Sequence, residues 1–314
     1  MSPSRYIATV VLATACILVA AGAASLYVIR NNLSTWHVSQ LFRYQTEKLA
    51  FGPPIDVLLI GDSSLGNAID ARRWSTSTGS VVENVALTGA YGYAGSLQML
   101  RRAVRHRRVL SAVIVQTPDM MTRAESHEGA LFSAESFSDL AEVPLNSLVP
   151  WLLSKDIILN ALRKPKSEEK NLWSNIKNND YMPQGRLANF TDLDSLKFSQ
   201  SSINNNKSVY LEKIFAFCNQ NGIRCIYAHG PIVAPLCTES AEYYNTVNAA
   251  IRAVGFDLLE TNPPCLTTEQ VGDQPDHVRP SFKSAISDHY QDLITRWLQT
   301  PSASGLTRVH HQDH

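Results

Sequence analysis

A serine stands where the first apolar run after the N-terminal region ends. Residues 55–60 read Ile-Asp-Val-Leu-Leu-Ile, and the tetrapeptide Gly61–Ser64 follows them. A hydroxyl in a turn after a strand is exposed at the sheet edge, where backbone N–H groups can also stabilise an oxyanion. Ser63 is therefore a candidate nucleophile. The alternative is that Asp62 and Ser63 are only turn and helix-cap residues.

A glycine turn follows the second apolar run. Residues 81–87 lead through Thr88 into Gly89. A glycine there lets the backbone approach a ligand closely and offer its N–H group. The continuation has neither GxGxxG spacing nor the lysine of a phosphate loop, which argues against nucleotide binding. Gly89 is a candidate oxyanion donor, unless the turn geometry alone requires the glycine.

A histidine with two nearby acids precedes the last helical segment. The loop reads Asp273-Gln274-Pro275-Asp276-His277. A serine nucleophile needs a base, and the base needs a carboxylate to orient it. His277 is the candidate base and Asp273 the preferred acid, because a turn can bring its side chain beneath the ring. Asp276 is the alternative acid, but we expect it to point away or to cap the following helix.

These three elements, in this order, resemble the SGNH/GDSL hydrolase superfamily. The tetrapeptide Gly61–Ser64 is similar to its first block, Gly89 to the glycine of its second, and the Asp-and-His loop to its last. The resemblance covers residues 55–120 and 222–298. It implies a flavodoxin-like three-layer α/β/α sandwich with a parallel sheet. It also implies ester hydrolysis or acyl transfer without a cofactor or metal. Ser63 would be the nucleophile, His277 the base, and the N–H groups of Ser63 and Gly89 the oxyanion donors.

The chain departs from the family pattern in two places. Where the family has an asparagine in its third block, this chain has Pro118, which cannot donate a hydrogen bond. Loss of one such donor can cost about 10²–10³ in rate. Gln116 and Thr117 are the possible substitutes; otherwise the oxyanion hole is incomplete. The family acid lies three residues before the histidine, a position that Gln274 occupies here.

Strands and helices are expected to alternate along the chain. Short apolar runs bounded by turns indicate buried strands, and 3.6-residue periodicity indicates helices. This alternation predicts an α/β fold with a parallel sheet, whose ligands bind at the carboxyl ends of the strands. The expected strands are 55–60, 81–87, 109–115 and 222–228, and the expected helices are 94–106, 210–221, 241–254 and 281–298.

The N-terminal region predicts a membrane helix. Residues 6–29 carry no charge and are long enough to cross the roughly 30 Å of a bilayer's hydrocarbon core. We favour an uncleaved anchor over a cleaved signal peptide, because the apolar run continues beyond the small residues 21–24. In either case the rest of the chain is exported.

The remaining sequence divides into four parts. Residues 31–50 are expected to form a polar, amphipathic linker that leaves the membrane, and 51–300 an SGNH-like domain. Residues 124–206 within it are expected to be an insertion, because they do not continue the strand–helix alternation. Residues 301–314 are expected to be a disordered tail. We expect its three histidines to be solvated and not to bind a metal.

Cysteine usage agrees with export. Four cysteines lie outside the apolar run, and none has the spacing of a zinc site. Three pairings are possible. We favour Cys218–Cys225 with Cys237–Cys265, which keeps each bridge local; the alternative is four buried thiols.

Charge and location complete the functional expectation. Lys and Arg together number 28, as do Asp and Glu, so a nucleic-acid partner is not expected. By the resemblance, we expect an esterase or O-acyltransferase acting on acyl groups of cell-envelope carbohydrate, on the periplasmic or extracellular side. A membrane-bound acyltransferase would be a partner. The alternative is an inactive SGNH-fold binding or scaffold protein of an envelope polysaccharide assembly complex.

Overall fold

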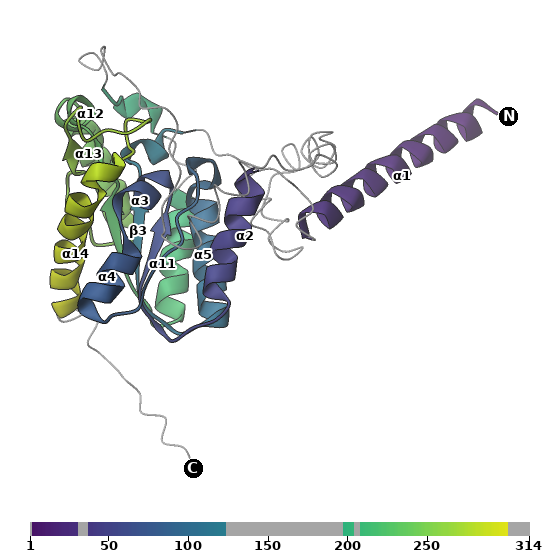
Figure 1. Cartoon of the computed structure of the whole chain (residues 1–314). Coiled ribbons are helices and arrows are strands. Elements are labelled where there is room, and N and C mark those ends of the chain that lie inside the picture. Colours follow the sequence, from purple (N-terminus) through teal and green to yellow (C-terminus); the bar gives the residue numbers. More distant parts are fainter. Residues whose placement is uncertain (1, 31–36, 124–196, 204–207, 301–314) are drawn as a thin grey trace.

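A computed structural model describes the chain except residues 1, 31–36, 124–196, 204–207 and 301–314 (Figure 1). The expected insertion 124–206 therefore falls mostly outside the described residues, and the expected disordered tail 301–314 falls entirely outside them.

A parallel sheet forms the centre of the domain, as the alternation of runs predicts. Its strands are β1 (Ile55–Gly61), β2 (Val82–Asn84), β3 (Val109–Gln116) and β4 (Arg224–His229), in the order β2-β1-β3-β4. Every neighbouring pair is parallel. β1 and β3 are almost continuously buried, because side chains on both sheet faces meet the core. All four strands end at the same edge of the sheet.

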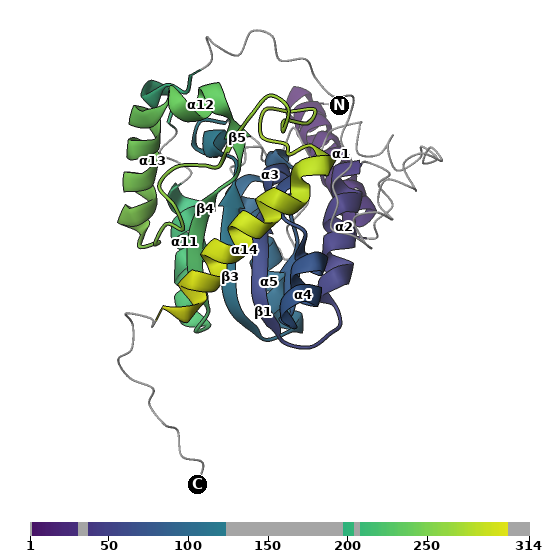
Figure 2. The same cartoon turned by 60° about the vertical axis from the view of Figure 1, so that its left-hand side comes forward.

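Helices cover both faces of this sheet (Figures 1 and 2). On one side lie α3 (Ser63–Ala68), α4 (Ala71–Thr78) and α14 (Lys283–Gln299). On the other lie α2 (His37–Leu49), α5 (Gly92–His106) and α11 (Ser208–Gln220), with α13 (Ala241–Val254) packed against α11. Short 3-10 turns occupy Gly89–Tyr91, Pro118–Met121, Gln200–Ser202 and Pro280–Phe282.

A second, smaller sheet lies beyond β4. Strands β5 (Ile232–Val233) and β6 (Cys265–Leu266) pair in parallel, and the short helix α12 (Ala234–Thr238) follows β5. This sheet supports the loop that carries His277, because the Val233 N–H donates to the Pro275 carbonyl at 2.9 Å.

The expected linker 31–50 contains a helix of the domain. Within α2, Leu41, Phe42 and Leu49 are buried in the core. The buried side chain of Gln45 donates to the Ala86 carbonyl at 2.6 Å. The amphipathic pattern of the segment is an apolar stripe at helical spacing, and this stripe packs against α5 instead of belonging to a linker.

The N-terminal helix α1 (Pro3–Arg30) fits the predicted membrane segment. Its window Pro3–Ala24 has a mean hydropathy of 2.4 and is long and apolar enough to span a membrane, as an anchor or a signal sequence would be. Apolar side chains such as Leu12 and Ile17 are exposed. These side chains therefore contribute nothing to the core of the domain.

Both predicted disulfides are confirmed. Cys218–Cys225 joins α11 to β4, and Cys237–Cys265 joins α12 to β6. Each bridge links segments that are already neighbours in the fold. Disulfides persist in oxidising compartments, which agrees with export.

Candidate functional site

The turn that follows β1 is held by Asp62. Its Oδ1 accepts hydrogen bonds from the N–H of Ser64 (3.0 Å) and from the Ser64 hydroxyl (2.6 Å), so Asp62 is the N-cap of α3. Its Oδ2 accepts the Thr117 N–H at 3.0 Å, which ties the end of β1 to the end of β3. Asp62 therefore has the structural role that the alternative interpretation proposed for this turn.

The two serines of the turn have different surroundings. Ser64 is fully buried and bonded to Asp62, whereas Ser63 is partly exposed. The Ser63 carbonyl accepts a bond from Nδ2 of Asn67 at 2.9 Å, but its hydroxyl forms no hydrogen bond with the described residues. Of the two hydroxyls, only that of Ser63 is accessible for chemistry.

Backbone bonds close the loop that carries His277. Val271 and Val278 form an antiparallel bridge across its base. The N–H of Gly272 donates to the His277 carbonyl at 2.6 Å, and the N–H of His277 donates to the Gln274 carbonyl at 3.1 Å. This tight turn brings the side chain of Asp273 beneath the ring of His277.

The structure brings Asp273 and His277 together. Nδ1 of His277 lies 2.7 Å from Oδ1 of Asp273, and both side chains are mostly buried. Nε2 faces the other way. The loop reaches the edge that carries Ser63, because Lys283, at the start of α14, donates to the Gly66 carbonyl of α3 at 2.9 Å. Within the described residues, no hydrogen bond joins Ser63 to His277; such bonds are often long in ligand-free enzymes.

The expectation for Asp276 is wrong. Its side chain neither points away from the site nor caps a helix, and it is only 5% exposed. Oδ1 lies 3.9 Å from Nε2 of His277, and Oδ2 lies 3.8 Å from Nη2 of Arg123. The positive charge of Arg123 attracts this carboxylate, so it turns toward Arg123 instead of toward the end of the helix.

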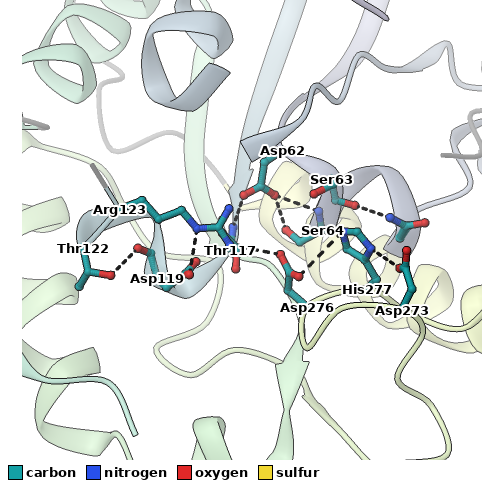
Figure 3. Close-up of polar contacts among 11 residues, drawn as sticks. Asp62, Ser63, Ser64, Thr117, Asp119, Thr122, Arg123, Asp273, Asp276 and His277 are labelled. Atoms are coloured by element: carbon teal, nitrogen blue, oxygen red, sulfur yellow. Dashed lines mark hydrogen bonds and ion pairs between the residues drawn. The ribbon is translucent and has the colours of Figure 1, made fainter. Parts of the chain in front are cut away.

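Arg123 is a site residue that the sequence did not suggest. It follows β3 and pairs with Asp119 at 2.9 Å. Figure 3 shows the resulting row of charged groups, from Asp119 and Arg123 past Asp276 to His277 and Asp273. The spacing of four residues between Asp119 and Arg123 was the available local signal. Nothing local indicated the contact with Asp276, which lies in a loop near the other end of the chain.

Gly89 lies against this arginine. A Cβ at position 89 would overlap Nη1 of Arg123. The backbone at Gly89 therefore approaches another group closely, as expected, but that group is the Arg123 guanidinium.

Of the possible substitutes for the family asparagine, Gln116 is engaged elsewhere through its side chain and Thr117 through its backbone N–H group. The side-chain amide of Gln116 donates to Ser96 at 2.8 Å inside the core. The Thr117 N–H donates to Asp62, and the Thr117 hydroxyl is buried without a hydrogen-bond partner among the described residues. Pro118 begins a 3-10 turn and has no N–H group. Within the described residues, none of the three forms a hydrogen bond with Ser63.

Charge and burial shift the titration of Asp62. Burial raises the pKa of its carboxyl to about 6, and the neighbouring Asp276 acts in the same direction. The Ser64 hydrogen bond, the Arg123 charge and the Thr117 N–H lower the pKa and limit this rise. Two carboxyl groups close together in a buried place resist simultaneous ionisation.

A cavity of about 650 Å³ lies outside this group of residues. It is lined by residues 260–265 together with Ile286 and His289 of α14. None of the predicted site residues lines it.

Comparison of the chain with protein-family models, curated proteins and solved structures finds no match.

Proposed function

We propose that this chain is an exported, membrane-anchored serine enzyme of the SGNH/GDSL hydrolase superfamily, with a flavodoxin-like three-layer α/β/α sandwich. Its proposed reaction is hydrolysis or transfer of O-acyl groups of cell-envelope carbohydrate. The observation that carries the proposal is the Asp273–His277 pair, placed at the sheet edge where Ser63 presents an accessible hydroxyl.

The proposed reaction follows from the orientation of the histidine. Asp273 holds the proton on Nδ1, which leaves Nε2 free to accept the Ser63 proton as Oγ attacks the acyl carbonyl. The carbonyl oxygen becomes an oxyanion, which the N–H groups of Ser63 and Gly89 would stabilise. His277 then protonates the departing sugar oxygen. Water, or an acceptor hydroxyl in a transferase, attacks the acyl-serine and releases the acyl group.

Location supports the envelope part of the proposal. The two disulfides favour an oxidising compartment, and α1 has the length and composition of a membrane anchor. An anchored enzyme works beside the membrane, where envelope polymers are assembled. A membrane-bound acyltransferase is the proposed partner.

A second candidate is an inactive binding or scaffold protein of an envelope assembly complex. The engagement of Gln116 and Thr117 favours it, as does the proline at position 118. An oxyanion hole with only two backbone donors would be slow. The two candidates differ in whether Ser63 reacts.

Hydrolysis of p-nitrophenyl acetate separates the two candidates. The enzyme proposal expects turnover by the wild-type chain and none by Ser63→Ala, with thermal stability changed by less than about 1 kcal/mol. Equal turnover by both chains would exclude Ser63, and no turnover by either would support the scaffold.

A further inference from the structure

The first observation concerns the direction in which α2 runs. Near its end, Lys48 donates to the Asn84 carbonyl at the end of β2. Near its middle, Phe42 stacks on Tyr91, with ring centroids 5.5 Å apart and planes 18° from parallel. Earlier residues of α2 therefore lie beside later residues of the segment that leads from β2 into the Gly89 turn. The helix runs antiparallel to the strands, and it begins at the carboxyl edge of the sheet (Figure 1).

The same edge carries the proposed active site. Ser63 follows β1, and Arg123, after β3, lies against Gly89 and reaches the loop of His277. The first residue of α2, His37, lies five residues before Phe42, or about 7 Å further along the helix axis in the same direction. The chain therefore enters the domain at the active-site edge.

The membrane helix lies close to this entry point along the chain. α1 ends at Arg30 and α2 begins at His37, with six residues between them. Seven Cα–Cα steps reach at most about 25 Å. A domain of about 250 residues is roughly 45 Å across. A tether about half that length keeps the edge to which it is attached near the membrane.

We propose that the Ser63–His277 edge faces the bilayer, and that the acyl ester on which it acts is held in the membrane instead of free in solution. This inference rests on the proposed function and on retention of α1. The donor would be an amphiphile of the bilayer, whose ester the short tether concentrates at Ser63.

The test uses the full chain in vesicles of phosphatidylethanolamine and phosphatidylglycerol. Two fluorophosphonates probe Ser63: one is water-soluble, and the other is attached to a diacyl lipid through a short spacer. A variant carries about 30 extra glycine and serine residues within 31–36, which lengthens the tether about sixfold. Effective concentration falls with roughly the three-halves power of length, so labelling by the lipid probe should fall about fifteenfold. Labelling by the soluble probe should not change.

The control carries the same insert after Thr300, where α14 has ended, and should react like the wild type with both probes. Unchanged labelling by the lipid probe in the lengthened variant would overturn the inference and leave the enzyme proposal intact. So would a mature chain without residues 1–30. If neither probe labels the wild type, the proposed function fails, and the inference fails with it.

Discussion

Nδ1 of His277 lies 2.7 Å from Oδ1 of Asp273, inside a loop that is closed by backbone hydrogen bonds. An imidazole held in this way has one tautomer, and its Nε2 is left for a reacting proton. In the proposed mechanism this pair makes Ser63 a nucleophile.

Asp273→Asn should lower kcat by about 10²–10⁴, because an amide at this position favours the wrong tautomer of His277. Asp276→Asn should cost less, since Asp276 lies 3.9 Å from Nε2 and does not orient the ring through Nδ1. Steady-state hydrolysis of p-nitrophenyl acetate measures both. A larger loss at Asp276 would make it the acid, and no loss at either would indicate a Ser-His dyad.

The two glycines of the site should differ in their tolerance of alanine. A Cβ at Gly61 would overlap the backbone carbonyl of Val115, so Gly61→Ala should lower the free energy of unfolding by more than about 2 kcal/mol. At Gly89 the Cβ would meet only the flexible end of Arg123, and the cost should stay below about 1 kcal/mol. Urea unfolding compares the two variants. Equal costs would show that Arg123 is rigidly held.

The two disulfides should affect catalysis unequally. Each should contribute about 2–4 kcal/mol to the free energy of unfolding. Only Cys237–Cys265 supports the small sheet that contacts the His277 loop. Replacing both of its cysteines by alanine should therefore lower kcat severalfold at a temperature where the chain stays folded. The Cys218–Cys225 double variant is the matched control, and an equal loss of kcat there would contradict this account.

Stability should depend on pH through Asp62. Its pKa is raised to about 6 in the folded chain from an ordinary value of 3.8, so folding favours the protonated carboxyl. This stabilisation is complete below the unfolded pKa and is lost as pH rises through the folded one. Between about pH 4 and pH 7, the unfolding free energy of the wild type should therefore fall relative to that of Asp62→Asn by on the order of 3 kcal/mol. Urea unfolding measures it; a constant difference would mean that the pKa is not raised.

The sequence was most informative where structure depends on neighbouring residues. The apolar run that became β1 and the short separation of Cys218 from Cys225 are local features, and both predictions were confirmed. The helix α2 was missed because Gln45 and Lys48 look solvent-exposed in the sequence. In the fold, both donate to backbone carbonyls of another segment.

The site was harder to predict, because its charges come from distant segments. Asp276 and Arg123 lie 153 residues apart in the sequence, and the residues around each of them do not indicate that they meet. Burial then raises the pKa of Asp62, an effect that depends on the packed fold as a whole.

Covalent labelling tests the central claim most directly, since it depends on the reactivity of one hydroxyl. The wild-type chain, Ser63→Ala and Ser64→Ala are each treated with a fluorophosphonate, and the modified residue is located by peptide mass spectrometry. We predict an adduct on Ser63 in the wild type and in Ser64→Ala, because the Ser64 hydroxyl is buried against Asp62, and no adduct in Ser63→Ala. An adduct of undiminished yield in Ser63→Ala, or none in the wild type, would contradict the assignment of Ser63 as the nucleophile.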